Sequence, residues 1–450
     1  TGGKVVVSNE SNAGNSYIYA LFAGTRGKFD FKSDGDNKIN LSILMPMVGP
    51  DRADRHGIGL YQGQFAFDGG HFRIEIGGEP EDGGFSHREG MVITAGSSVD
   101  IKADLIEVDV SEVAMSLASR MGSTNYPVVS GAMNRVNFEA DYISIKAGQI
   151  GLWVGGDVDA YGTSSQIEFT GQTKIEALSR GDVDNFYGEV VGGKAIELSS
   201  TEITFNGITE VVGENLTFLG TRPGYDHEFL GWLDGYWLRT ITIMDHSTLT
   251  ANDDFIVTSN GGYYNTGFYL WESEAYFNGK VRINMLNGGD TTRGVYSIGT
   301  TEDTSPTRAI FRDDVIISLA GSDARYVSGM EAAGGGVIKV QKGLQITDND
   351  NATWSLFSRE ENSLIDVNTS GTGTIQLKGD IGAINDATLN MVLNNEDSWV
   401  TAASYTETNF GTTPGTVNLA LTNGSVWNMT DSSCYEPDDG QQYRELSAAG

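Results

Sequence analysis

The chain of 450 residues carries 60 acidic and 29 basic side chains, which gives a formal net charge of −31. Such an acidic surface repels nucleic acid and anionic membranes, so neither is expected as a partner. The one cysteine, Cys434, excludes an internal disulfide and a cysteine-based zinc site. No run of 18 apolar residues occurs, so no membrane-spanning helix is expected.

A strand pattern recurs along the chain, and Ser165–Leu178 shows it most clearly. Ile167 and Phe169 alternate with polar residues, Gly171 interrupts the alternation, and Ile175 resumes it. This pattern predicts a strand, a bend and a second strand. It returns with a mean spacing of about 34 residues, which is typical of a stacked repeat protein. The equivalent positions are Phe31, Phe67, Ile101, Phe138, Phe169, Phe205, Thr250, Phe277, Phe311, Val340 and Val367.

A third short apolar segment precedes most copies, as in Gly57–Tyr61 and Gly267–Trp271. Three short strands per repeat, rich in glycine (59) and poor in proline (8), predict an all-β, right-handed parallel β-helix. The handedness follows from the general rule for parallel crossovers. We expect one solenoid over residues 1–433, with long repeats over 1–380 and compact three-stranded repeats over 381–433. Residues 434–450 form an acidic, strand-poor tail.

Insertions interrupt the repeats, and most are expected between the last strand of one repeat and the first strand of the next. These segments are Leu44–His56, Glu79–Gly90, Arg120–Gly131, Ser179–Gly193 and Gly220–Gly235. Gly155–Ser164 and Gly299–Thr307 are expected to leave from another corner. Insertions that share a corner form a ridge, where repeat proteins often bind partners. The alternative is that they only cover apolar rims.

Ala387–Ala402 and Thr416–Ser432 resemble each other closely, since both alternate apolar residues, turn, and continue through serine and tryptophan. Together with Gly57–Tyr61 and Ala275–Met285, these segments resemble the passenger domains of autotransporters of the self-associating adhesin type from Gram-negative bacteria. The resemblance covers Thr1 to about Ser433. It implies a β-helix that is exported across the outer membrane and exposed on the cell surface. The chain begins within the strand pattern, which favours a processed or excised fragment.

Catalytic motifs are absent from the sequence. None of the five histidines lies near a Gly-x-Ser-x-Gly turn, and the chain has neither a phosphate-binding loop nor a His-Glu-x-x-His motif. The adjacent pairs Asp253/Asp254 and Asp313/Asp314 are possible glycosidase carboxylates, but neighbouring strand residues face opposite ways. We interpret both pairs as turn residues. No catalytic residue and no cofactor are therefore expected.

Two segments rich in aspartate and asparagine, Asp34–Asn37 and Asp348–Asn351, offer oxygen atoms to a calcium ion. Calcium takes 6–8 oxygen ligands, and four consecutive residues supply only some of them. The glycine-rich nonapeptide of calcium-binding repeats is also absent. We interpret both segments as solvated turns and expect no metal site.

Aromatic residues gather in two places, Tyr225–Trp237 and Tyr263–Trp271. Rings stack on sugars and anchor protein interfaces. The strand residues Phe268 and Trp237 are expected to be buried or to lie on alternating faces, whereas the insertion Gly220–Gly235 can present its rings to a partner. The candidate binding residues are Arg222, Tyr225, Asp226, His227, Phe229 and Trp232.

The expected function is that of a cell-surface adhesin that acts by binding and not by catalysis. Its partner would be a glycan or protein receptor on a host or bacterial surface, a second copy of the chain, or both. Two alternatives stay open at this point: a carbohydrate-active β-helix enzyme, and a structural stalk without a ligand.

Overall fold

A computed structural model describes thirteen parts of the chain, and all of their regular elements are strands. Among these residues no helix is long and apolar enough to cross a membrane. The chain divides into two compact units. Unit 1 comprises Thr1–Asn215, Trp232–Gly235 and Ser247–Asn252, and unit 2 comprises the rest. The described residues are 4–8, 17–45, 54–77, 88–117, 132–154, 164–178, 193–215, 237–300, 307–319, 324, 326–347, 354–405 and 413–430.

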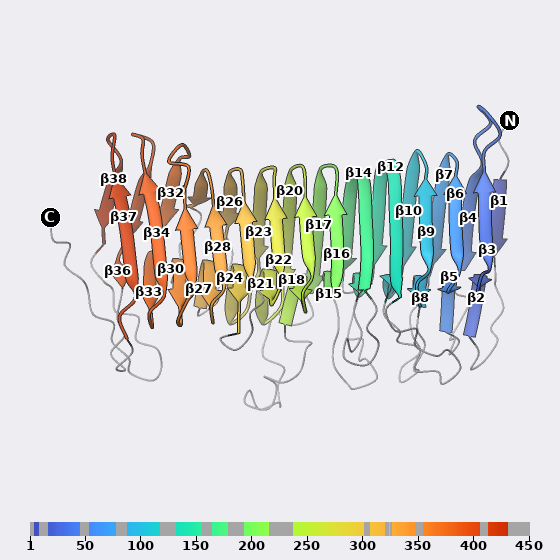
Figure 1. Ribbon diagram of the computed structural model, residues 1–450, viewed down its shortest axis with the longest axis horizontal. Coiled ribbons are helices and arrows are strands. Elements are labelled where there is room, and N and C mark those ends of the chain that lie inside the picture. The colour runs from blue at the N-terminus through green and yellow to red at the C-terminus, as the bar shows by residue number, and fades with distance from the viewer. Residues whose placement is uncertain are drawn as a thin grey trace. The chain divides into compact units, whose positions relative to one another are not determined.

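In unit 1 the strands form two sheets, here called sheet A and sheet B (Figure 1). The sheet B strands are β2 (Tyr17–Ala23), β5 (Asp54–Tyr61), β8 (Arg88–Thr94), β11 (Val113–Ser116), β13 (Ile150–Val154) and β15 (Lys194–Ser199). The sheet A strands are β1 (Lys4–Ser8), β3 (Lys28–Lys32), β4 (Asn40–Met45), β6 (Gln64–Asp68), β7 (His71–Ile76), β9 (Ser98–Lys102), β10 (Leu105–Val110), β12 (Met133–Ala147), β14 (Ser164–Leu178), β16 (Thr201–Phe205), β17 (Thr209–Asn215) and β19 (Thr248–Ala251).

Unit 2 has the same two kinds of sheet. Its sheet B strands are β18 (Trp237–Met244), β21 (Tyr264–Trp271), β24 (Thr291–Ile298), β27 (Tyr326–Ala333), β30 (Trp354–Arg359), β33 (Asp380–Ile384) and β36 (Ser404–Tyr405). Its sheet A strands are β20 (Phe255–Gly261), β22 (Glu274–Phe277), β23 (Val281–Leu286), β25 (Arg308–Phe311), β26 (Val315–Ser318), β28 (Val337–Val340), β29 (Leu344–Ile346), β31 (Leu364–Val367), β32 (Ile375–Lys378), β34 (Thr388–Leu393), β35 (Trp399–Ala402), β37 (Thr416–Leu421) and β38 (Val426–Met429).

The strands pair in parallel with the equivalent strand of the next repeat, as β3, β6 and β9 do. Phe31 pairs with Phe67 and Phe67 with Ile101, so the positions predicted as equivalent stack on one another. One prediction is wrong by a single residue. Ala251, and not Thr250, pairs with Phe205, because Thr250 points away from the core while Ala251 is buried.

The bend predicted at Gly171 is present within the single long strand β14. Gly171 has a φ of +118°, and a Cβ there would lie 1.7 Å from the carbonyl oxygen of Ala140. Only glycine fits this position. On its two sides, Phe169 pairs with Phe205 and Thr173 pairs with Thr209, so β14 contributes to two neighbouring strand stacks.

The corners from which the insertions leave differ from the prediction in one case. Residues 118–131 connect β11 of sheet B to β12 of sheet A, as residues 155–163 connect β13 to β14. The segment Arg120–Gly131 therefore leaves from the same corner as the predicted exceptions. The prediction failed because β11, with the sequence VAMS, is short and lacks the glycine and aromatic residues of sheet B segments such as β5 and β21.

The compact repeats near the end of unit 2 pair with each other, which confirms their similarity: β34 pairs with β37 and β35 with β38. Their tryptophans occupy different positions, however. Trp399 pairs with Val426, and Trp427 pairs with Val400 and donates its indole N–H to the carbonyl oxygen of Ala402 at 3.1 Å.

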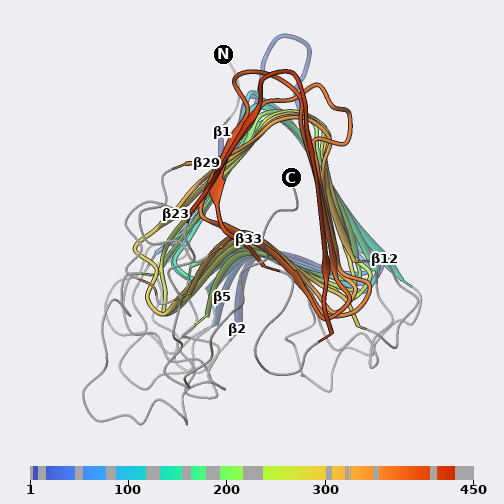
Figure 2. The same ribbon diagram turned by 90° about the vertical axis from the view of Figure 1, so that its left-hand side faces the viewer.

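Sheets A and B differ in burial. Sheet A strands alternate buried and more exposed residues, whereas β5 and β27 of sheet B are buried on both faces over most of their length. Figure 2 shows β2 and β5 of unit 1 on one side and β1 and β12 on two others, and β33 of unit 2 apart from β23 and β29. The outer face of sheet B thus contains side chains that are partly withdrawn from solvent, where polar interactions are strong.

Candidate functional site

In unit 2 the outer face of sheet B gathers tyrosines, arginines and one glutamate. Tyr269, Tyr296 and Glu331 occupy the same register position on β21, β24 and β27. They face away from the core, because Phe268 and Leu270 on either side of Tyr269 are fully buried. We call this surface the aromatic–arginine face; its residues are Arg239, Tyr269, Trp271, Arg293, Tyr296, Tyr326, Glu331 and Arg359.

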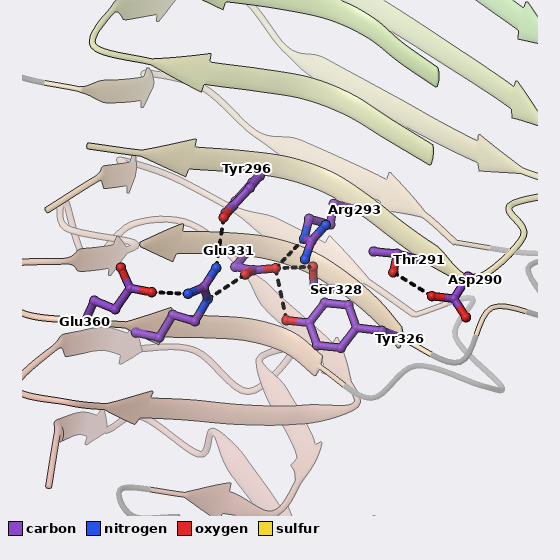
Figure 3. A network of polar contacts seen from close by, with 9 residues as sticks. Asp290, Thr291, Arg293, Tyr296, Tyr326, Ser328, Glu331 and Glu360 are labelled. Carbon is purple, nitrogen blue, oxygen red and sulfur yellow. Dashed lines mark hydrogen bonds and ion pairs between the residues drawn. The ribbon is translucent and has the colours of Figure 1, made fainter. Parts of the chain in front are cut away.

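Glu331 is the centre of the face, as Figure 3 shows. One carboxylate oxygen accepts from Arg293 Nε at 2.6 Å and from the Tyr326 hydroxyl at 3.0 Å. The other accepts from Arg359 Nε at 2.9 Å. Arg359 also donates to the Tyr296 hydroxyl at 2.9 Å. A single buried carboxylate therefore fixes two arginines and the Tyr326 ring directly, and it fixes the Tyr296 ring through Arg359.

The charges of this network support one another. Burial alone would raise the pKa of Glu331, whose side chain is 1% exposed, but Arg293 and Arg359 outweigh burial and lower it. In the same way, the pKa values of both arginines are raised by Glu331 against the effect of burial. Glu331 is consequently ionised at neutral pH, and Arg359 also pairs with the partly exposed carboxylate of Glu360.

The tyrosine hydroxyl groups stay protonated in this setting. Burial raises the pKa of Tyr326 well above its ordinary value, and the negative charge of Glu331 adds to the effect. Burial also raises the pKa of Tyr296. Protonated hydroxyls beside guanidinium groups make this part of the face a set of hydrogen-bond donors.

Cations and rings are also stacked on the face. The guanidinium carbon of Arg239 lies 3.9 Å from the centre of the Tyr269 ring, and that of Arg293 lies 4.7 Å from the Tyr296 ring. The Tyr269 and Tyr296 rings meet edge to face at 5.8 Å. Trp271, two residues beyond Tyr269 on the same face, is 38% exposed. Pre-oriented rings with an exposed indole beside them suit a sugar ring or an aromatic-rich protein interface.

An apolar cluster borders the face on the later repeats of unit 2. Trp354 and Phe357 stack at 4.4 Å, and Tyr405 meets Trp354 edge to face at 5.4 Å. Tyr326 packs against this cluster and also reaches Glu331. The cluster therefore holds one side of the polar network in place.

The predicted binding residues Arg222, Tyr225, Asp226, His227, Phe229 and Trp232 lie outside the described residues, so that assignment stays a prediction. The second aromatic segment is described. Phe268 is buried in the core as expected, while Tyr269 and Trp271 lie on the opposite, outer face. Sequence reasoning missed the residues stacked in register with Tyr269, because Tyr296 and Glu331 belong to separate repeats. Aligning the sheet B segments by their shared register would have found them.

The aspartate pairs at 253–254 and 313–314 lie in turns between sheet A strands, as interpreted from the sequence. In each pair the first carboxylate accepts the neighbouring backbone N–H at 2.8 Å. The second carboxylate accepts a backbone N–H from the next repeat, that of Lys280 at 2.9 Å and that of Gly343 at 3.0 Å. The first carboxylate of each pair therefore stabilises its own turn, and the second links that turn to the next repeat within unit 2.

The two calcium candidates differ in what can be said of them. Asp34 and Asn37 form an isolated bridge that closes a turn between β3 and β4. Asp348–Asn351 lies outside the described residues. Within the described parts of the chain, no group of three or more histidine, cysteine, aspartate or glutamate side chains is placed to hold a metal ion.

Comparison with known proteins finds no matching family model, no matching curated protein and no matching solved structure.

Proposed function

We propose that the chain is a cell-surface adhesin that binds its partner through the aromatic–arginine face, without catalysis. The observation that carries this proposal is the combination of Tyr269, Trp271 and Arg293 on one face of β21 and β24, all at least partly exposed. Tyrosine, tryptophan and arginine are the residues that most often dominate binding energy at interfaces. The partner is a glycan or protein receptor on a host or bacterial surface, or a second copy of the chain.

The proposal includes a fold that suits display of such a face. We infer a right-handed parallel β-helix in which one sheet B strand and two sheet A strands make one turn. It is supported by the parallel pairing of each strand with its counterpart one repeat later. The resemblance of the sequence to autotransporter passenger domains agrees with this arrangement. On the basis of that resemblance, the proposal includes export across the outer membrane to the cell surface.

The network around Glu331 explains why the face is suited to binding. A ring that is free in solution loses rotational freedom when it contacts a ligand, and that loss weakens the complex. Tyr296 is held in advance by Arg359, and Tyr269 is sandwiched against Arg239. The rings are therefore already ordered before a partner arrives.

The test is to replace Tyr269 and Trp271 by alanine, singly and together, in cells that display the chain. Each substitution should weaken adhesion or cell aggregation by about 1–2 kcal/mol in binding free energy, the usual contribution of an interface anchor. Because both residues lie outside the core, the melting temperature of the purified protein should change little.

Tyr276→Ala is the matched control, since Tyr276 is a half-buried tyrosine on sheet A of the same unit. It should leave adhesion unchanged. If adhesion survives the Tyr269→Ala/Trp271→Ala variant, or if Tyr276→Ala weakens it equally, the aromatic–arginine face is not the binding surface. The predicted loop Gly220–Gly235 would then be the next region to truncate.

A further inference from the structure

We propose that a polar groove in unit 1 binds an acidic oligosaccharide, a chain of sugars that carries carboxylate groups. The groove follows the corner where sheet B strands turn into sheet A strands, far along the sequence from the aromatic–arginine face. It has a volume of about 620 Å³, within the usual range for ligand sites. It is lined by Thr25, Arg26, Gln62, Ala95, Gly96, Ala132, Met133 and Arg135.

Two unpaired arginines lie along the groove. Arg26 and Arg135 are exposed, and among the described residues neither guanidinium group has a hydrogen-bond or ion-pair partner. By contrast, Lys28 and Lys102 near the groove both have acidic partners, in a chain of net charge −31. None of the lining residues is acidic. The groove is therefore a local positive site on an acidic protein, and it would select an anion.

The groove has a floor that is already fixed by hydrogen bonds. Asn134, almost fully buried, accepts the backbone N–H of Gly96 at 2.9 Å and of Ser97 at 3.2 Å. Ser97 in turn accepts the N–H of Gly63 at 3.1 Å. A ligand would meet a surface that needs no rearrangement, which favours binding.

The spacing of the arginines favours a polymer over a single anion. Arg135 pairs with Ser98, Ser98 with Gln64, and Gln64 with Lys28, which lies two residues after Arg26. Three strand spacings, roughly 14 Å between backbones, therefore separate the two ends of the groove. An extended chain with repeated carboxylates can place one carboxylate at each guanidinium group, each held by a forked pair of hydrogen bonds.

Neutral groups between the arginines fit the hydroxyl groups of a sugar. Gln62 accepts the Thr25 hydroxyl at 3.1 Å, and its amide nitrogen has no partner among the described residues. An acidic peptide fits less well, because peptides bind such proteins by adding a strand to a free sheet edge. Here the backbone beside the groove is already paired. The backbone N–H of Arg26 donates to the carbonyl oxygen of Gln62 at 3.0 Å, and that of Arg135 donates to the carbonyl oxygen of Ser97 at 3.0 Å.

The experiment measures binding of a galacturonate hexamer to the purified chain by calorimetry. Its probes include the methyl-esterified hexamer, galacturonate monomer and a glutamate hexapeptide. The variants Arg26→Gln and Arg135→Gln should each weaken hexamer binding about tenfold, the effect of losing one charge-assisted contact. The monomer and the ester should bind at least tenfold more weakly than the acid hexamer, and added salt should weaken the complex.

Arg282→Gln is the matched control, because Arg282 is an exposed arginine of unit 2 that also lacks a partner among the described residues. It should leave hexamer binding unchanged. Arg135→Lys keeps the charge but loses the forked geometry, so its affinity should fall between wild type and Arg135→Gln. Full binding by the Arg26→Gln/Arg135→Gln variant, equal binding of the ester, or tighter binding of the glutamate peptide would each overturn the proposal. None of these outcomes depends on the aromatic–arginine face.

Discussion

Both units bury a carboxylate against arginine, but they do so in different ways. In unit 1, Glu112 accepts the backbone N–H of Arg88 at 3.0 Å and its Nη1 at 3.2 Å, and the Arg88 side chain is completely buried. In unit 2, Glu331 is shared by Arg293 and Arg359, whose side chains are 17% and 27% exposed. The first carboxylate serves an enclosed pair, while the second serves a network that reaches the surface.

The difference indicates what each arrangement can do. An enclosed pair gives little net stability, because the loss of water around two charges offsets their attraction, yet removing one partner is costly. A network with partly exposed arginines still has donors available to a ligand, and its buried centre keeps them in position. Unit 1 therefore uses its buried carboxylate for structure, whereas unit 2 supports a candidate binding face with its own.

The largest effect is expected from Glu112→Ala in unit 1. The substitution leaves the Arg88 guanidinium buried without its carboxylate and should destabilise the surrounding strands by about 3–5 kcal/mol. Repeat proteins can open locally, so the measurement is hydrogen exchange at the amides of β8, β10 and β11. Glu107→Ala, which removes a 41% exposed carboxylate paired with His71, should cost less than about 1 kcal/mol. Equal protection in the two variants would contradict the contrast between enclosed and exposed pairs.

Glu331→Gln should have the next largest effect, with about 2–3 kcal/mol of local destabilisation, because Arg293 and Arg359 then lose the carboxylate that they share and only Arg359 keeps an anion, Glu360. The cost is smaller than in unit 1, since both arginines can turn partly into water. Hydrogen exchange in β24, β27 and β30 measures it, and adhesion should fall at the same time as the tyrosines lose their fixed positions. Glu360→Gln removes a 42% exposed carboxylate that also contacts Arg359, and it should leave both readouts nearly unchanged. If Glu331→Gln kept full adhesion, the Glu331 network would not be needed for binding.

Acidification should produce a smaller change at the Glu331 network of unit 2. The pKa of Glu331 is lowered in the folded chain, so its stabilising effect is complete above the ordinary carboxylate pKa of about 4.3. The effect is lost as the pH falls through the lower folded value. Hydrogen exchange in β27 should therefore speed up below about pH 4 in the wild type, relative to Glu331→Gln measured at each pH. If the ratio of the β27 exchange rates of the wild type and Glu331→Gln does not change with pH, Glu331 does not titrate as described.

Much of the fold was predictable from the sequence because the alternation of period two survives in most of the sheet A strands that the structure describes. It located Phe31, Phe67 and Phe277 at equivalent positions, and the bend at Gly171 followed from one glycine. It failed at Thr250, where alanine replaces the usual aromatic residue and the alternation alone does not fix the register. A one-residue shift of that kind exchanges the two faces of a strand.

The candidate site was much less predictable. Alternation tells which residues share a face of one strand, but contacts between strands depend on insertion lengths that vary from repeat to repeat. Arg293 and Arg359 are 38 and 28 residues from Glu331, and neither spacing equals the mean repeat. The groove of unit 1 poses the same difficulty, because Arg26 and Arg135 are brought to one corner only by three successive register steps.

The smallest effect is expected from Tyr326→Phe, which removes one hydroxyl from Glu331 and leaves both arginines in place. At neutral pH it should cost about 1 kcal/mol, the value of one hydrogen bond. Burial and then Glu331 raise the pKa of Tyr326 in the folded chain, whereas an unfolded tyrosine ionises near pH 10. The stability contributed by its proton is therefore complete below about pH 10 and is lost as the pH rises further. Hydrogen exchange of β27 at pH 8 and pH 10.5 should show this loss in the wild type but not in Tyr326→Phe, after correction for the intrinsic exchange rate.

The control is Tyr142→Phe, because Tyr142 is a half-buried tyrosine on sheet A of unit 1. This variant should behave like the wild type. If Tyr326→Phe lost as much protection at high pH as the wild type, the hydroxyl of Tyr326 would not be part of the network that separates unit 2 from unit 1.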